Sequence, residues 1–200
     1  TTHRSGEPNW LEDELAVRQL TPKGKLRAAI NFGNPVLAQR DAVSGEPRGV
    51  SADLAHGLAQ RLGVPVEFHG FDTAGKVVEA ALEDVWDIAF MAIDPQRAQS
   101  IAYTAPYVLI EGTYLVREDS PFRGVRDLDV PGSRIAVGKG AAYDLFLTRT
   151  LEHAAIVRLP LSEDAMEQFA DLGLDAAAGV RQPLQAYAKA HMGYRVLEDR

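Results

Sequence analysis

Short apolar segments alternate with amphipathic segments along nearly the whole chain, and this alternation constrains the fold more than any other feature. Strands are expected at residues 25–31, 64–68, 88–93, 113–117, 134–137, 156–159, 176–178 and 194–197. Helices are expected at residues 10–20, 51–62, 74–84, 141–151, 162–172 and 181–190. This order of elements predicts an α/β fold with mostly parallel sheets and flanking helices.

Composition narrows the classes of partner. The 200 residues carry a formal net charge of −7, with Lys and Arg scattered along the chain, which argues against nucleic acid. The chain has no Cys, and its five His show no metal-ligand spacing, so we expect no metal and no cofactor. No apolar run is long enough to cross a bilayer, and Thr1 does not open a signal peptide. We therefore expect either a cytosolic protein or the mature form of an exported one.

Residues 86–107 contain the most informative single side chain. A buried strand is predicted at 88–93, and Asp94-Pro95 then opens a helix, with Asp94 as its N-cap. Arg97 falls in the first helical turn, where the helix dipole disfavours a cation. A bound carboxylate or phosphate would remove this conflict, because the guanidinium and the backbone N–H groups would share the anion. A solvated surface arginine is the alternative, and spacing alone favours it.

Two lobes joined near Thr113 would leave a cleft between them. In open α/β sheets, ligands bind beyond the carboxyl ends of the strands. The loops expected at those ends are residues 31–35, 94–97, 138–143 and 179–183. In the helix expected at 51–62, Leu54, Leu58 and Leu62 share one face.

Several fragments of the chain resemble the family 3 solute-binding proteins of ABC importers, the group that carries polar amino acids. They follow one another in the family's order: Gly49–Ala55, Trp86–Ile88, Arg97, Tyr103–Tyr107, Asp127-Leu128, Ile135–Gly140 and Gly173–Ala176. The resemblance implies a two-lobed type II periplasmic-binding-protein fold that closes on a small solute, outside the cytoplasm and in partnership with an ABC permease. It divides the chain into an N-terminal extension and helix (1–24), lobe 1 (25–112), and a hinge strand with lobe 2 (113–200).

The resemblance also implies a set of ligand-binding residues. Arg97 matches the arginine that holds the ligand carboxylate in this family. Phe32 matches an aromatic residue that packs on the ligand, although a role in the lobe core is equally common. The full set of expected ligand contacts is Asn31, Phe32, Asn34, Asp94, Arg97, Lys139, Gly140, Ala141, Tyr143 and Arg181.

The chain departs from the family pattern at positions that bear on the ligand. Asp94 stands where the family has Thr, and Ala141-Ala142 replaces a Thr pair. The acidic residue that usually binds the ligand ammonium is replaced by Val180, with Arg181 next to it. A cationic group near Arg181 and Lys139 would be repelled, whereas a second anion would be attracted. These substitutions favour a keto acid or a dicarboxylate over a standard amino acid; solvated loop charges are the alternative for both cations.

Family members normally return to lobe 1 after the last strand expected here, whereas this chain stops at Arg200. We therefore expect the C-terminal part to be missing, or lobe 1 to be completed by another copy in a homo-oligomer. Two other functions share the fold: a cyclohexadienyl-dehydratase-like enzyme and the ligand-sensing domain of a receptor. Because no carboxylate lies in an acid–base motif, we expect a binding protein and not an enzyme.

Overall fold

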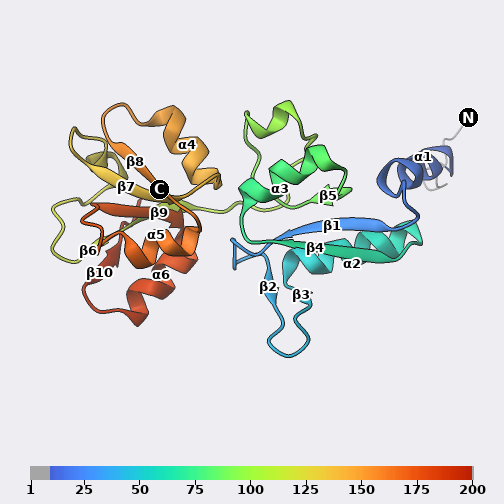
Figure 1. Ribbon diagram of the computed structural model, residues 1–200, viewed down its shortest axis with the longest axis horizontal. Coiled ribbons are helices and arrows are strands. Elements are labelled where there is room, and N and C mark those ends of the chain that lie inside the picture. The colour runs from blue at the N-terminus through green and yellow to red at the C-terminus, as the bar shows by residue number, and fades with distance from the viewer. Residues whose placement is uncertain (1–9, 200) are drawn as a thin grey trace, which may run out of the picture.

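The computed structural model describes residues 10–199 as two α/β lobes that lie side by side (Figure 1). The helices are α1 (Trp10–Leu20), α2 (Val50–Leu62), α3 (Ala74–Ala80), α4 (Ala142–Thr150), α5 (Ser162–Gln168) and α6 (Arg181–Ala190). The strands are β1 (Leu26–Asn31), β2 (Gln39–Arg40), β3 (Pro47–Arg48), β4 (Val66–Phe71), β5 (Ile88–Ala89), β6 (Gly112–Arg117), β7 (Arg134–Gly138), β8 (Ala155–Leu159), β9 (Ala176–Val180) and β10 (Tyr194–Val196).

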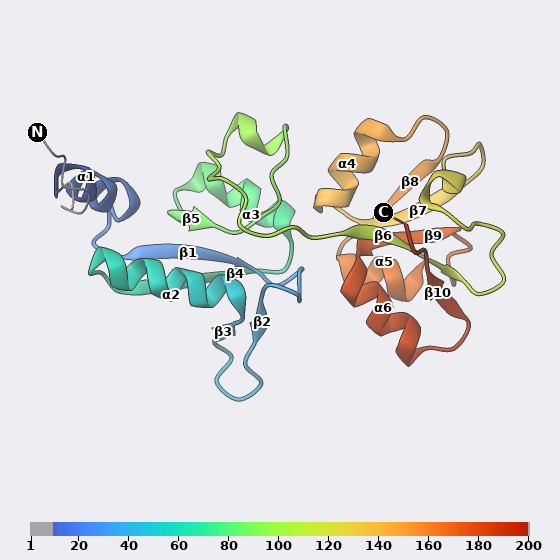
Figure 2. The same ribbon diagram turned by 180° about the vertical axis from the view of Figure 1, so that it is seen from behind.

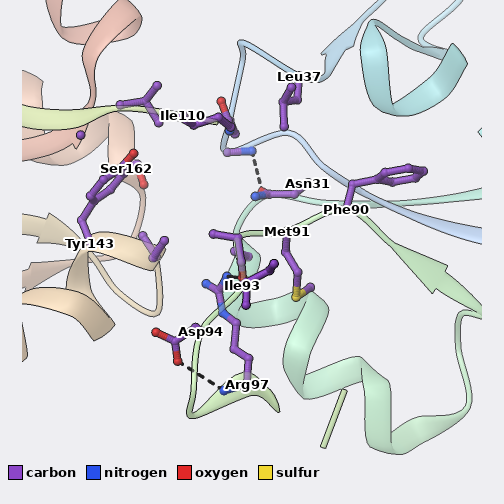
Figure 3. A pocket seen from close by; sticks show the side chains of 18 of the residues that line it. Asn31, Leu37, Phe90, Met91, Ile93, Asp94, Arg97, Ile110, Tyr143 and Ser162 are labelled. Atoms are coloured by element: carbon purple, nitrogen blue, oxygen red, sulfur yellow. Dashed lines mark hydrogen bonds between the residues drawn. The ribbon is translucent and has the colours of Figure 1, made fainter. Parts of the chain in front are cut away.

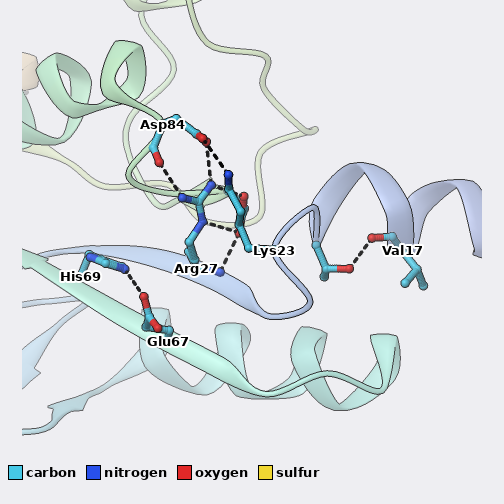
Figure 4. Close-up of polar contacts among 8 residues, drawn as sticks. Val17, Lys23, Arg27, Glu67, His69 and Asp84 are labelled. Atoms are coloured by element: carbon cyan, nitrogen blue, oxygen red, sulfur yellow. Dashed lines mark hydrogen bonds and ion pairs between the residues drawn. The ribbon is translucent and has the colours of Figure 1, made fainter.

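Lobe 1 is built on a three-stranded parallel sheet with strand order β4-β1-β5. At the base of this sheet, Arg27 of β1 donates hydrogen bonds to Asp87 Oδ1 (2.8 Å) and Asp84 Oδ1 (2.8 Å). Lys23 forms a further ion pair with Asp84, and Figure 4 shows this cluster around the Arg27 guanidinium. The Arg27 and Asp87 side chains are 8% and 4% exposed, so a buried ion pair ties β1 to the turn before β5.

Lobe 2 is built on a five-stranded sheet with strand order β10-β6-β9-β7-β8. β7 is parallel to β8 and β9, whereas β6 is antiparallel to its neighbours β9 and β10. Adjacent strand residues point to opposite faces, so Val116 and Leu115 join separate buried clusters, one on each face of the sheet. The sheet is therefore covered on both sides, as the near-continuous apolar strands predict.

The predicted order of elements is confirmed, but several boundaries were wrong. The strand predicted at 88–93 pairs only through β5, at Ile88–Ala89, and the helix predicted after Asp94 is a single 3₁₀ turn at Arg97–Gln99. Other predicted helices are shorter, because α3 ends at Ala80 and α5 ends at Gln168. Helix α2 packs through small side chains, since Ser51, Ala52, Ala55 and Ala59 are buried and Leu54 is 43% exposed.

The described chain passes from lobe 1 to lobe 2 through residues 101–111, which form neither helix nor strand. Figures 1 and 2 show the chain crossing between the lobes there. Helix α1 lies at the end of lobe 1 that is remote from lobe 2 in both views. None of the helices within residues 10–199 has the length and apolar character needed to cross a membrane.

Candidate ligand-binding cleft

A cavity of about 1810 Å³ is lined by residues of both lobes. This volume exceeds the roughly 300–1,000 Å³ that is typical of small-molecule sites. The cavity extends beyond the cleft, because apolar side chains of α1, α2 and the segment before β5 also line it: Leu20, Leu54, Leu58 and Trp86. The polar residues of the cleft therefore define the candidate site better than the outline of the cavity does.

Arg97 is the central charged residue of the cleft, and it is only 3% exposed. Its Nη1 donates to the carbonyl oxygen of Ala92 (3.3 Å), and its Nη2 donates to that of Gly140 (2.9 Å) across the cleft. Its Nε is buried and has no hydrogen-bond partner among the described residues. The guanidinium thus retains a buried donor for an additional acceptor, and an anion would satisfy both its hydrogen bond and its charge.

Burial lowers the pKa of the Arg97 guanidinium, and the nearby Tyr103 and Asp94 act in the opposite direction. Arginine nevertheless stays protonated at any physiological pH. Its hydrogen bonds to Ala92 and Gly140 go to neutral carbonyl groups, and none of the ion pairs among the described residues includes Arg97. A buried cation without a carboxylate in direct contact is an unusual and costly arrangement, which a ligand carboxylate would relieve.

Asp94 caps the turn that carries Arg97, as predicted. Its Oδ1 accepts the backbone N–H of Gln96 (2.8 Å) and that of Arg97 (3.3 Å). Its Oδ2 accepts a hydrogen bond from Arg149 Nη1 of lobe 2 (2.7 Å). Burial raises the pKa of Asp94, but Arg149 and the two backbone donors outweigh burial, so the net pKa is lowered. Figure 3 shows Asp94 next to Arg97 on the lobe 1 side of the cavity, with Tyr143 and Ser162 of lobe 2 opposite.

The loop after β7 is held in place by a buried carboxylate. Asp144, which is 4% exposed, accepts the Gly140 N–H at Oδ2 (2.9 Å) and Arg158 Nε at Oδ1 (2.9 Å). Thr148 donates to the same Oδ1 (3.2 Å). This network fixes the Gly140 N–H. The next peptide group, whose Ala141 N–H donates to the Gly138 carbonyl oxygen (3.1 Å), carries the Gly140 carbonyl oxygen that accepts from Arg97. Asp144 therefore stabilises the lobe 2 residue that accepts a hydrogen bond from Arg97 of lobe 1.

Asn31, Phe32 and Asn34 all line the cavity, at the carboxyl end of β1. Both asparagine side chains stabilise the loop, because Asn31 Oδ1 accepts Gly33 N–H (2.9 Å) and Asn34 Oδ1 accepts Val36 N–H (3.2 Å). The Arg40 guanidinium carbon lies 3.9 Å from the centre of the Phe32 ring. One face of this aromatic residue is therefore covered by Arg40.

Lys139, Ala141 and Tyr143 line the cavity from lobe 2. Tyr143 packs against the first residue of β6, since a Cβ added to Gly112 would lie 2.0 Å from Tyr143 Cε1. Burial raises the pKa of Tyr143 to about 12, so its hydroxyl stays protonated at neutral pH and is available as a donor.

Gly140 and Arg181 are not among the residues that line the cavity. The Arg181 guanidinium donates instead to Glu111 Oε2 (3.2 Å) and to the carbonyl oxygens of Leu197 (3.1 Å) and Asp199 (2.9 Å). These contacts attach the C-terminal end of the described chain to the start of β6. They give Arg181 a structural role, and the geometry offers no support for its predicted contact with a ligand.

Arg149, Asp144 and Arg158 are parts of the site that the sequence analysis did not assign. Asp144 and Thr148 share one side of α4 at a spacing of four residues, which is the only local sign of their contact. The Asp94–Arg149 pair joins residues separated by 55 positions, and no local pattern predicts it. Among the side chains that the structure describes, in residues 14–199, no group of three or more His, Asp or Glu forms a possible metal site.

Comparison with solved structures shows a shared fold. An ancestral amino acid-binding protein, a precursor of cyclohexadienyl dehydratase, is 24% identical with a TM-score of 0.73, covering 92% of this chain and 81% of its own. ArgBP from T. maritima is 23% identical with a TM-score of 0.74, covering 90% and 79%. An amino acid ABC transporter substrate-binding protein from Streptococcus pneumoniae is 21% identical with a TM-score of 0.75, covering 92% and 78%. The TM-scores establish that this chain has the type II periplasmic-binding-protein fold. Sequence identities this low do not show that the chain binds the same ligands.

A comparison with curated protein sequences finds no match. The profile of one protein family, in contrast, matches residues 26–190, which extend from β1 to the end of α6 and include Arg97, Asp94 and the other polar residues of the cleft. The chain therefore belongs to the bacterial extracellular solute-binding proteins, family 3.

Proposed function

We propose that this protein captures a small carboxylate-bearing solute in the cleft between its lobes and delivers it to an ABC importer from the periplasm. The observation that carries the proposal is the buried Arg97 guanidinium, which is 3% exposed and keeps an Nε–H without a hydrogen-bond partner among the described residues. A carboxylate bound there would pair with a cation that has already been desolvated, so little further desolvation of the protein would oppose binding.

The rest of the proposed ligand set surrounds Arg97. Asn31, Phe32 and Asn34 would contact the solute from lobe 1, and Lys139, Ala141 and Tyr143 would contact it from lobe 2. Asp94 and Gly140 position Arg97 through hydrogen bonds. Arg181 is left out of this set, because its guanidinium bonds to Glu111 and to the C-terminal carbonyl groups. Completion of lobe 1 by a second copy stays a prediction.

The class of solute depends on whether an ammonium group is accepted. Val180 lines the cavity at the position where the family resemblance implies an acidic residue, and Lys139 adds a positive charge. Both features favour a keto acid or a dicarboxylate. The S. pneumoniae relative is bound to L-arginine, so an amino acid is the competing class. In that case another carboxylate that lines the cavity, such as Asp72 or Glu163, would have to hold the ammonium group.

Three carboxylates in or beside the cleft give no support to an enzymatic function. Asp94, Asp144 and Glu111 each accept a hydrogen bond from an arginine side chain. A charged partner of this kind stabilises the ionised carboxylate, whereas a general acid at neutral pH requires a protonated one. We therefore propose solute binding without catalysis; incubation with prephenate or arogenate should give no turnover.

A thermal-shift screen with matched solutes tests the proposal. Each α-amino acid is paired with its keto acid, for example glutamate with 2-oxoglutarate, and succinate serves as a dicarboxylate without either group. A solute that binds only the folded protein raises the melting temperature, by an amount that grows with its concentration. A shift with keto acids or dicarboxylates alone supports the proposed class, and a larger shift with glutamate or arginine would overturn it. The absence of a shift with every carboxylate would contradict the carboxylate site.

A further inference from the structure

The two lobes contact each other directly through charged side chains next to the proposed site. Asp94 belongs to the turn that precedes Arg97 in lobe 1, and Arg149 belongs to the last turn of α4 in lobe 2. Arg149 Nη1 donates to Asp94 Oδ2 at 2.7 Å. The Arg149 side chain is 40% exposed, whereas the Asp94 side chain is 4% exposed. The carboxylate of the ion pair is therefore buried, whereas the arginine is partly exposed to solvent.

The two oxygens of Asp94 have separate roles, so the ion pair does not compete with the cap. Oδ1 accepts both backbone N–H groups of the turn that carries Arg97. Oδ2 accepts only from Arg149 among the contacts of the described residues. A residue with a single side-chain acceptor could cap the turn equally well, and the second oxygen is what allows Asp94 to bind lobe 2.

Two further contacts form at the same place, and both involve Gly140. Its carbonyl oxygen accepts from Arg97 Nη2 (2.9 Å). Its backbone also approaches the start of α3 in lobe 1, since a Cβ added to Gly140 would lie 3.0 Å from Gly75 Cα. Opening of the cleft on this side would separate all of these contacts together, whereas the bonds within each lobe would persist.

We infer that Arg149 is a closure residue, and that the Asp94–Arg149 ion pair acts as a latch that favours the closed arrangement of the lobes whether or not a solute is bound. The pair forms only when the lobes meet, so its free energy acts entirely on the equilibrium between open and closed arrangements. A partly exposed ion pair changes such an equilibrium by up to about fivefold. The inference goes beyond solute capture, because it concerns the protein without solute.

Distance measurements between the lobes test the latch. The chain has no Cys, so two introduced cysteines can be spin-labelled without background. Leu82 in lobe 1 and Met192 in lobe 2 are suitable positions, because they are 83% and 100% exposed and lie outside the cleft. Pulsed electron paramagnetic resonance on the Leu82→Cys/Met192→Cys protein, without added solute, reports the ratio of short to long distances. This ratio is the reference for the Arg149 and Asp94 variants, and a ratio that none of these variants changes would overturn the inference.

Variants of Arg149 separate the latch from a general effect of surface charge. Arg149→Gln should raise the open-to-closed ratio by about threefold to fivefold. Arg149→Lys keeps the charge and should retain most of the closed population. Arg126→Gln is the matched control, because Arg126 lines the cavity from lobe 2 but forms no ion pair among the described residues. An unchanged ratio in Arg149→Gln, an equal change in Arg126→Gln, or a Lys variant as open as the Gln variant would each overturn the latch.

Asp94→Thr provides the same test from lobe 1. The threonine hydroxyl can still cap the 3₁₀ turn, but it removes the acceptor that binds Arg149. Its open-to-closed ratio should match that of Arg149→Gln, and the double variant should open no further. Additive opening in the double variant would show that the two residues act independently, and would overturn the latch. Since no solute is present, these results do not depend on whether the proposed ligand class is correct.

Discussion

At the scale of single residues, two buried arginine side chains, Arg27 and Arg97, have different roles in this protein. Arg27 is buried against Asp87 and Asp84, so its charge is compensated within lobe 1. Arg97 is equally buried, but its hydrogen bonds to the protein go to the neutral carbonyl groups of Ala92 and Gly140. The difference in partners identifies Arg27 as structural and Arg97 as the proposed anchor of a ligand.

The first prediction concerns Arg27. Arg27→Met should lower the free energy of unfolding by about 3–5 kcal/mol, because it leaves the carboxylate of Asp87 buried without its cation. Urea denaturation measures the change. Arg27→Met/Asp87→Leu should recover part of the lost stability, since the isolated buried charge is removed while the Arg27 backbone N–H loses its acceptor, Asp87 Oδ2 (2.9 Å). A loss in the double variant as large as in the single one would contradict this explanation.

The second prediction concerns pH and Asp94. Its pKa is lowered in the folded protein, because Arg149 and two backbone N–H groups together outweigh the effect of burial. A carboxylate with a depressed folded pKa contributes stability above its unfolded pKa of about 3.9, and that contribution is lost as the pH falls through the lower folded value. The stability difference between wild type and Asp94→Asn should therefore be constant above about pH 5 and shrink on acidification. A difference that grows below pH 4 would contradict the shift.

At the scale of elements, the loop after β7 places the backbone carbonyl of Gly140 against Arg97, and glycine is needed there for two reasons. Gly140 has φ +74°, in the left-handed region, and its Cα faces Gly75 of α3. The Asp144 carboxylate accepts hydrogen bonds from the Gly140 N–H and from Arg158 Nε. Close approach of the lobes thus depends on a loop whose conformation is set within lobe 2.

The third prediction separates these two reasons for glycine. Gly140→Ala and Gly45→Ala both place alanine at φ +74°, but only Gly140 has a neighbour, because nothing lies within 4 Å of a Cβ at Gly45. Both substitutions should lower the free energy of unfolding by about 1–2 kcal/mol. Only Gly140→Ala should raise the open-to-closed ratio and weaken solute binding. Equal ratios in the two variants would show that the Gly75 contact does not limit closure.

Local patterns in the sequence predict the elements well and their partners less well. The predicted strands and helices occur in the predicted order, and the strand-end loops of residues 31–35, 94–97 and 138–143 do line one cavity. The pattern of Leu54, Leu58 and Leu62 did not reveal the buried face of α2, because small residues pack closest to the sheet. Nor could local patterns reveal that Arg181 bonds to Glu111 or that Asp94 bonds to Arg149, since both pairs depend on the tertiary arrangement.

At the scale of the whole molecule, the proposed site exists only when both lobes are present and close together. Arg97 and Asp94 come from lobe 1, whereas Gly140, Tyr143 and Arg149 come from lobe 2. The apparent affinity for a solute is the intrinsic affinity of the closed form multiplied by the fraction of protein that is closed. Arg149→Gln should therefore weaken solute binding by the same factor by which it lowers the closed fraction. Calorimetric titration measures this change, and an unaltered affinity in an opened variant would contradict it.

The most direct test of the central claim is calorimetric titration of Arg97→Ala with the solute that stabilises the wild-type protein most. The account predicts complete loss of measurable binding, with a free energy of unfolding close to that of wild type, because a desolvated cation is removed together with its two hydrogen bonds to carbonyl groups. Gly45→Ala, which alters lobe 1 at a residue that does not line the cavity, should bind as wild type does. Micromolar binding by a folded Arg97→Ala protein would contradict the assignment of Arg97 as the carboxylate anchor.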